Sequence, residues 1–317
     1  MGKSHAPRRG TLQFWPHRRA KSETARIRYW APLKETKPLA FLGYKAGMCH
    51  VIAIDNRPKA LTKGEEVGIP VTILECPPMK VVAINFYRLM PVGQQMISTI
   101  RAPSWDKEME RVLQMQKKPS KNISDVVFDD LRLVIATQPK LTGIGTKKPK
   151  LAEVALSGSK EEKLKFAQER LGKEITVSDV FKEGNLVDIH AITKGKGFQG
   201  PVKRHGVMLR HHKSEKARRA NVRGSWTGPS MWTAPHSAKM GYNLRTEFNK
   251  LVLKIGTNLD DVRAAGGITN YGVVKNTYLL VKGSVAGSQK RVITLAHATR
   301  PDMNVPKEAP LIKKVIL

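Results

Sequence analysis

Two long segments of this 317-residue chain are rich in lysine and arginine and carry almost no acid. Residues 1–37 hold ten Lys or Arg against Glu23 and Glu35, and residues 194–245 hold twelve against Glu215 alone. Neither segment keeps the apolar period of a helix or a strand. Because such segments bury too little apolar surface to fold alone, we expect two extended basic regions that become ordered on a polyanionic partner.

Aromatic side chains are set among these charges. Their rings offer surfaces on which the bases of single-stranded nucleic acid stack. The alternative is that both segments are ordinary solvated charge runs, which would have no need of large rings. The pattern favours contact with nucleic acid, and the aromatic residues concerned are Phe14, Trp15, Tyr29, Trp30, Trp226 and Trp232.

The charge balance of the whole chain supports this interpretation. It has 56 Lys+Arg against 26 Asp+Glu, a formal net charge of +30. A compact chain with this charge repels itself, so a polyanion is expected to neutralise it, nucleic acid first and a membrane surface second. The membrane alternative is weak, because the sequence offers no spanning run of about 18 apolar residues, no signal peptide and no basic amphipathic helix.

Hydrophobic residues make up 40% of the chain, which is enough to form a buried core between the two basic regions. The two cysteines, Cys49 and Cys76, are too few for a disulfide framework or a metal cluster. We expect two small buried thiols, in a protein of a reducing compartment.

Short apolar and β-branched runs separated by Gly and Pro predict a mainly β fold, a small antiparallel barrel or sandwich. The predicted strands lie at 39–54, 71–74, 81–87, 186–192, 250–255, 277–282 and 291–296.

The middle of the chain has a different pattern, typical of an α/β insertion. Residues 104–117 place Trp105, Met109, Val112 and Leu113 on one helical face. A second predicted helix, 159–172, begins with Ser159 and Glu162 at capping-box spacing and stops at Gly172, and a strand at 131–137 lies between the two. The expected organisation is a basic arm at 1–37, a split β barrel at 38–90 and 184–300 with a loop at about 197–245, the insertion at 91–183, and a tail at 301–317.

The motifs of catalysis are weak or missing. GKGFQG at 195–200 has the spacing of a dinucleotide-binding turn but is followed by Pro201 and basic residues, not by a helix and an acid. His205 with His211 and His212 has no Cys or carboxylate partners nearby for a metal, and no G-x-S-x-G elbow is present. We therefore expect no enzyme, no metal, no cofactor and no small-molecule substrate. An RNA-modifying enzyme or another RNA-binding module remains the alternative.

One stretch, from residue 181 to residue 204, resembles the signature of a known family. It has the pattern F-x6-D-x2-A-x-T-x-G-K-G-x2-G-x3-R, carried by Phe181, Asp188, Ala191, Thr193, Gly195, Lys196, Gly197, Gly200 and Arg204. This is similar to the universal large-subunit ribosomal protein three family. Four further stretches agree with it: HAPRRGTLQFWPHRRA, FLGYKAGM at 41–48, MGYNLRTEFNK at 240–250 and VKGSVAGSQKR at 281–291. Length and arm resemble the archaeal type.

The resemblance implies a structural constituent of the cytoplasmic large ribosomal subunit. It implies a translation-protein-type β barrel on the subunit surface, bound to large-subunit rRNA early in assembly beside neighbouring large-subunit proteins. The arm and the loop at about 197–245, with Trp226 at the loop's tip, would extend toward the peptidyl-transferase centre.

The glycines at 195, 197 and 200 are expected to let the backbone approach RNA closely, although an ordinary tight turn would also use them. The residues predicted to contact RNA are Arg8, Arg9, Trp15, Arg18, Arg19, Arg26, Arg28, Lys45, Lys194, Gly195, Lys196, Gly197, Gly200, Lys203, Arg204, His211, His212, Lys213, Arg218, Arg219, Arg223, Trp226, Trp232, Lys239 and Arg245.

Overall fold

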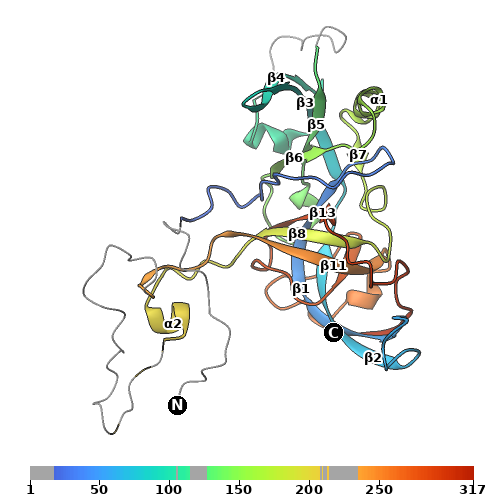
Figure 1. The fold of residues 1–317 in the computed structure, drawn as a ribbon, viewed down its shortest axis with the longest axis vertical. Coiled ribbons are helices and arrows are strands. Elements are labelled where there is room, and N and C mark those ends of the chain that lie inside the picture. Colours follow the sequence, from blue (N-terminus) through green and yellow to red (C-terminus); the bar gives the residue numbers. More distant parts are fainter. Residues whose placement is uncertain (1–17, 105, 115–126, 208, 210–212, 214–234) are drawn as a thin grey trace. The chain divides into compact units, whose positions relative to one another are not determined.

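The computed structural model of the chain describes residues 18–104, 106–114, 127–207, 209, 213 and 235–317. It divides into two compact units, a smaller one of residues 1–21 and 193–244 and a larger one of residues 22–192 and 245–317. Strands dominate the larger unit (Figure 1), which confirms the predicted mainly β fold class.

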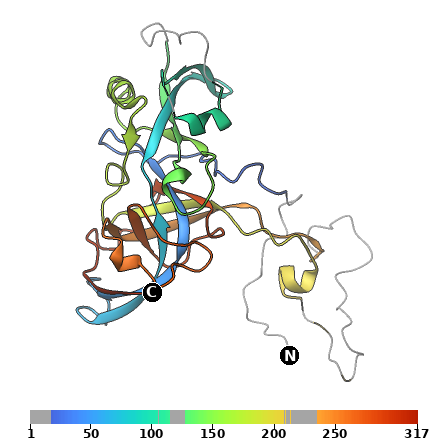
Figure 2. The same cartoon turned by 180° about the vertical axis from the view of Figure 1, so that it is seen from behind.

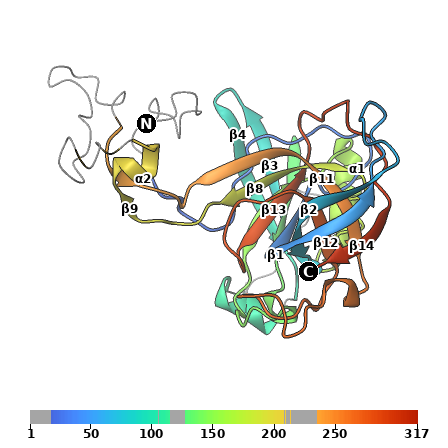
Figure 3. The same ribbon diagram turned by 90° about the horizontal axis from the view of Figure 1, so that it is seen from below.

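The larger unit contains a seven-stranded antiparallel sheet. Its strands, in the order in which they pair, are β13 (Val292–His297), β8 (Leu186–Ile192), β11 (Leu244–Gly256), β12 (Tyr278–Lys282), β2 (Glu66–Glu75), β1 (Ala40–Ile54) and β14 (Ile312–Ile316). β13 pairs in addition with β1, because the sheet curves strongly enough to bring its first strand beside its sixth (Figure 3).

Strand β1 is long enough to pair with three other strands. Its first residues pair with β13, with Ala40 opposite Ala296, and its last residues pair with β14, with Val51 opposite Val315. Along its other edge it pairs with β2 from Tyr44, opposite Glu75, to Ile54, opposite Glu66. Gly43 allows close packing here, since a Cβ at this position would lie 2.9 Å from the Sγ atom of Cys76.

The core of this sheet is made of the apolar runs that the sequence predicts as strands. Phe41, Leu42, Ile73 and Tyr278 are fully or almost fully buried, and burial of each such side chain contributes about 1.5–3 kcal/mol. Both cysteines are free and buried as expected, and burial raises the pKa of the Cys49 thiol to about 11.

A second antiparallel sheet forms the rest of the larger unit. Its strands pair in the order β4 (Gly93–Arg101), β3 (Met79–Met90), β5 (Asp130–Ala136) and β6 (Leu151–Ala155), and β7 (Glu174–Ile175) pairs with β3. The expected insertion began at residue 91, whereas β3 already belongs to this sheet from residue 79. The reason is its partners: β3 pairs with β4, β5 and β7.

Helix α1 (Lys160–Arg170) lies beside this second sheet (Figures 1 and 2) and confirms the second predicted helix. The Oγ atom of Ser159 accepts from the backbone N–H of Glu162 at 3.4 Å, and a carboxylate oxygen of Glu162 accepts from the N–H of Ser159 at 3.0 Å. This reciprocal capping box satisfies two backbone donors that the first helical turn leaves without partners.

The predicted helix over 104–117 is wrong in the part that the structure describes. A short 3-10 helix covers only Lys107–Arg111, and its N-cap Asp106 makes no side-chain capping bond. Met109 is buried and Leu113 packs against it, so the predicted apolar residues do meet, but over one turn. The expected tail at 301–317 also contains β14, which the sequence analysis did not predict.

Candidate nucleic-acid interface

The smaller unit is built around a two-stranded ribbon. Two segments run antiparallel, one leaving β8 and the other leading into β11. Between them β9 (Phe198–Gln199) pairs with β10 (Ala238–Lys239), about forty residues further along the chain. The backbone N–H of Lys196 donates to the carbonyl of Met240 at 2.9 Å, and the N–H of Met240 donates to the carbonyl of Gly197 at 2.8 Å. These bonds hold the basic KGKG turn in one conformation.

The end of the N-terminal arm adds a third segment to this ribbon. The N–H of Ala20 donates to the carbonyl of Tyr242 at 2.8 Å, and the Nδ2 atom of Asn243 donates to the carbonyl of Arg18 at 2.7 Å. The two basic regions of the sequence are therefore in contact within the smaller unit, although the contacting residues lie more than 220 positions apart in the chain. The sequence alone did not predict this contact.

Exposed cations gather in the smaller unit, whose described residues include no acid. The exposed cations that were predicted to contact RNA and that lie here are Arg18, Arg19, Lys194, Lys196, Lys203, Lys213 and Lys239. This excess of exposed lysine and arginine gives a positive field suited to phosphates.

The glycines of the ribbon have different roles. Gly241 has φ +76, and a Cβ there would lie 2.0 Å from the carbonyl oxygen of Lys194, so the two strands approach as closely as they do only because it is glycine. Gly197 also has a positive φ, +66, which indicates the tight turn that was the alternative for these residues. A Cβ at Gly197 or Gly200 would have no atom within 4 Å, so nothing in the described chain covers either position.

Arg204, a predicted RNA contact, is turned inward. It lies in helix α2 (Pro201–His205), is buried, and its Nη1 atom donates to the carbonyl of His236 at 2.8 Å. Burial lowers the pKa of this guanidinium. The structure thus gives Arg204 a partner inside the smaller unit, where it ties α2 to the returning segment.

Four predicted residues lie in the larger unit. Arg26, Arg28 and Arg245 are exposed. Lys45 is half-buried, and its ammonium donates to the carbonyl of Val285 and, at 3.5 Å, to that of Gly287. Lys45 therefore ties β1 to the loop before β13. Ten further predicted residues lie outside the described part of the chain: Arg8, Arg9, Trp15, His211, His212, Arg218, Arg219, Arg223, Trp226 and Trp232.

Phe198 is a candidate that the sequence analysis missed. Its side chain is 72% exposed on β9, between Gly197 and Gln199 and directly opposite Lys239. An aromatic residue inside the cationic KGKGFQG run was a signal of base stacking that the sequence did contain.

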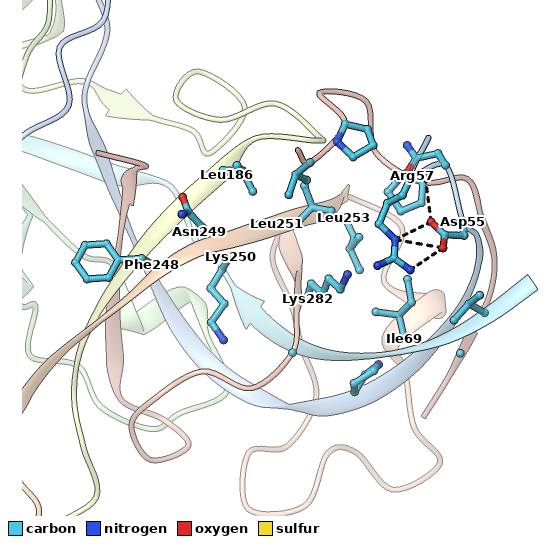
Figure 4. Close-up of a pocket in the computed structure, with 18 residues that line it drawn as sticks. Asp55, Arg57, Ile69, Leu186, Phe248, Asn249, Lys250, Leu251, Leu253 and Lys282 are labelled. Atoms are coloured by element: carbon cyan, nitrogen blue, oxygen red, sulfur yellow. Dashed lines mark hydrogen bonds and ion pairs between the residues drawn. The ribbon is translucent and has the colours of Figure 1, made fainter. Parts of the chain in front are cut away.

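A hollow of about 550 Å³ in the larger unit has a different character (Figure 4). Its lining includes Ile69, Leu251 and Leu253. Asp55 is the sole acid among the 18 residues lining it, and Arg57 holds it through an Nη2–Oδ2 contact of 2.7 Å. The Arg57 guanidinium holds the pKa of the Asp55 carboxyl well below its usual range. The one carboxylate of this hollow is thus committed to an ion pair.

In the part of the chain that the structure describes, His, Cys, Asp and Glu form no group of three or more that could hold a metal ion. The same residues contain no helix of the length and apolar character needed to cross a membrane.

Comparison with known proteins gives an independent result. The family described as Ribosomal protein L3 matches residues 1–125 and 113–316 of the chain. The protein named large ribosomal subunit protein uL3 from Archaeoglobus fulgidus is 44% identical over 309 residues, covering 94% of this chain and 93% of that protein. Its namesake from Methanothrix thermoacetophila is 41% identical over 324 residues, covering 98% and 97%. The namesake from Methanopyrus kandleri is 41% identical over 321 residues, covering 96% and 89%.

Similarity over nearly the whole length of both chains places the protein among the structural constituents of the large ribosomal subunit, which are not enzymes. The chain belongs to the ribosomal protein L3 family. The family predicted from the motif at 181–204 is confirmed, and so is its archaeal type.

Proposed function

We propose that the smaller unit is the main rRNA-binding part of this ribosomal protein. The observation that carries the proposal is the three-segment ribbon, in which exposed cations of the N-terminal arm and of the second basic region are held together. The described residues of that unit include no acid. Each phosphate that such a cation neutralises releases counterions, which supplies affinity that falls steeply as salt rises.

The larger unit then acts as the rigid anchor of this ribbon. We propose that its seven-stranded sheet closes into the translation-protein-type β barrel that the sequence resemblance implies. Two pairings support closure: β13 pairs with β8 on one edge and with β1 on the other, so β13, β8, β11, β12, β2 and β1 form an unbroken ring of neighbours. Such a ring leaves no free edge among its members.

The finer parts of the function follow from the family resemblance. In the cytoplasmic large subunit, the arm at 1–37 and the loop at about 197–245 extend along rRNA toward the peptidyl-transferase centre, with Trp226 at the loop's tip. Binding takes place early in subunit assembly, and neighbouring large-subunit proteins dock on surfaces of the larger unit. A basic ribbon suits this role, because rRNA phosphates neutralise the repulsion among its cations.

Sedimentation of cell extracts on sucrose gradients tests the proposal. The tagged chain should migrate with large subunits. A variant with Lys194, Lys196, Lys203 and Lys239 changed to Gln should shift toward the free fractions. The matched control changes four exposed lysines of the larger unit, Lys59, Lys63, Lys307 and Lys314, to Gln and should stay in subunits. Equal incorporation of the two variants would contradict the assignment of rRNA binding to the smaller unit.

A further inference from the structure

A second hollow, of about 640 Å³, lies wholly within the smaller unit. Its size falls within the roughly 300–1,000 Å³ of pockets that hold small organic ligands. Backbone of the three ribbon segments forms its walls, and its lining includes Arg19, Gly197, Phe198, Lys239 and Tyr242. It therefore combines cations, bare glycine backbone and aromatic rings in one place.

The side chain of Phe198 lines this hollow and remains mostly exposed to solvent. With 72% of its surface exposed, it forgoes most of the about 1.5–3 kcal/mol that burial of a phenylalanine side chain contributes. It lies opposite Lys239 in the β9–β10 pair, so a flat apolar surface and an ammonium group stand side by side. This pair of features suits a ligand that has both a planar ring and a negative charge.

The backbone beside Phe198 is open to close approach. A Cβ on Gly197 would meet no atom within 4 Å, although the positive φ there already requires glycine. On the other side, Tyr242 has φ +54, an uncommon conformation for a large residue, and packs against Gly195, where an added Cβ would lie 3.6 Å from its Cβ atom. Backbone held in such a conformation is often found where a side chain must be aimed at a ligand.

We propose that this hollow binds a single unpaired nucleotide of rRNA, whose base stacks on Phe198 and whose phosphates contact Arg19, Lys21 and Lys239. The inference rests on the proposed function and adds to it a defined subsite with a base-stacking residue. An unpaired nucleotide fits because only a base outside a helix exposes a face to a protein ring. An anion without a ring would leave Phe198 unused, and an apolar peptide would leave the three cations without partners.

The first experiment measures binding of the full-length protein to a transcript of large-subunit rRNA over a range of salt. Phe198→Ala should weaken binding about 5- to 150-fold, the effect of losing one stacked base. It should leave the slope of log affinity against log salt unchanged, because no charge is removed. Lys239→Gln should instead lower that slope by roughly 0.7–0.9. Phe198→Trp should retain the affinity. Phe248→Ala, which removes an aromatic residue 48% exposed in the larger unit and outside the basic arm, is the control and should have no effect.

The second experiment identifies the nucleotide. Base-specific chemical probing of the wild-type and Phe198→Ala complexes should reveal one nucleotide whose reactivity differs. An abasic residue at that nucleotide should weaken binding of the wild type by the same factor as Phe198→Ala, with no further loss when the two changes are combined, as a double-mutant cycle requires for a direct contact.

The outcomes separate the subsite from the function. If wild-type protein fails to bind the rRNA in a salt-dependent manner, the proposed function itself is contradicted. If it binds but Phe198→Ala binds equally well, or if the abasic change has no effect, the hollow holds no stacked base and the subsite is refuted while the function stands. Loss of a neighbouring ribosomal protein from Phe198→Ala subunits, with unchanged RNA probing, would show that the hollow binds protein and would also refute it.

Discussion

The two units of the protein distribute charge in opposite ways. The smaller unit has 17 Lys or Arg and one acid in 73 residues, whereas the larger unit has 39 Lys or Arg and 25 acids in 244 residues. More than half of the net charge of +30 thus falls on less than a quarter of the chain. In the larger unit many cations are paired with acids, for example Lys163 with Asp130 and Lys254 with Asp261.

The difference in charge is accompanied by a difference in hydrogen-bond acceptors: acidic side chains in the larger unit and backbone carbonyls in the smaller unit. In the larger unit, buried acids organise loops: Asp188 accepts from the N–H of Asn249 and from both the N–H and the hydroxyl of Thr299, at 2.9–3.0 Å. In the smaller unit the corresponding internal acceptors are backbone carbonyls, as at Arg204. The larger unit thus provides acids for its own polar groups, whereas lysines of the smaller unit such as Lys196 and Lys239 are exposed to solvent.

The largest expected effect is a loss of stability in the larger unit when its buried acid Glu75 is replaced. Glu75 is fully buried and accepts from the N–H groups of Lys275 and Asn276, from the Nδ2 of Asn276 at 2.7 Å and from the Tyr271 hydroxyl. Glu75→Ala leaves these donors without an acceptor, so denaturant unfolding should show a loss of roughly 2–5 kcal/mol. Glu66→Ala, on the exposed part of the same strand, should cost far less. RNA affinity of folded Glu75→Ala protein should stay normal, and a parallel loss would show that the units are not independent.

The next effect concerns pH and also belongs to the larger unit. His297 is buried, and its Nε2 atom donates a hydrogen bond of 3.0 Å to the carbonyl of Val180. Burial, together with the positive charge of Lys37, lowers the pKa of the His297 ring to about 4. Below about pH 6.5 the unfolded chain binds a proton at this ring while the folded protein does not, so stability falls as the pH drops toward 4.

The loss from this single group amounts to about 3 kcal/mol at most. His297→Gln should make the free energy of unfolding less dependent on pH between about 6.5 and 4. The comparison is with His50→Gln, at an exposed position of β1, which should keep the wild-type pH dependence. An identical pH profile for His297→Gln and the wild type would contradict the assignment.

A smaller effect tests whether RNA reaches the backbone of the ribbon. Gly200 has an ordinary φ of −69, and a Cβ there meets nothing within 4 Å, so Gly200→Ala should leave unfolding of the free protein nearly unchanged. If RNA approaches this glycine, the methyl group should weaken binding roughly tenfold, the equivalent of one lost hydrogen bond to a charged group. Gly68→Ala, equally open but in the larger unit, is the matched control. Normal RNA binding by Gly200→Ala would contradict close approach of RNA to this glycine and would favour an ordinary tight turn as its role.

The smallest effect sharpens the electrostatic contrast between the units. Lys196→Gln should lower the slope of log affinity against log salt by roughly 0.7–0.9, because one phosphate contact is lost. Lys282→Gln removes an equally exposed cation at the end of β12 in the larger unit and should leave the slope unchanged. Equal slopes for the two variants would mean that RNA contacts both units alike.

Much of the fold could be predicted because strand and cap signals are local. The run at 186–192 coincides with β8, and the Ser159–Glu162 spacing marks the start of α1, since each depends on side chains within a few residues. The strands β4 and β14 were missed for the opposite reason. Their residues are mostly exposed and show no clear alternation, and they become strands through pairing with β3 and β1.

The sequence by itself determined the family, the mainly β class and the chemistry of the partner, because motif spacing, apolar runs and net charge are properties of the chain as written. Only the tertiary structure decided which cations remain exposed. Lys45 and Arg204 carry the same kind of charge as Lys196 and Lys239, yet the first two are engaged by backbone carbonyls and the others face solvent. It also brought Arg19 beside Phe198 in one hollow. Which cations are exposed and which residues line the hollow depend on contacts between segments that are distant in the sequence. Local sequence patterns do not predict these contacts.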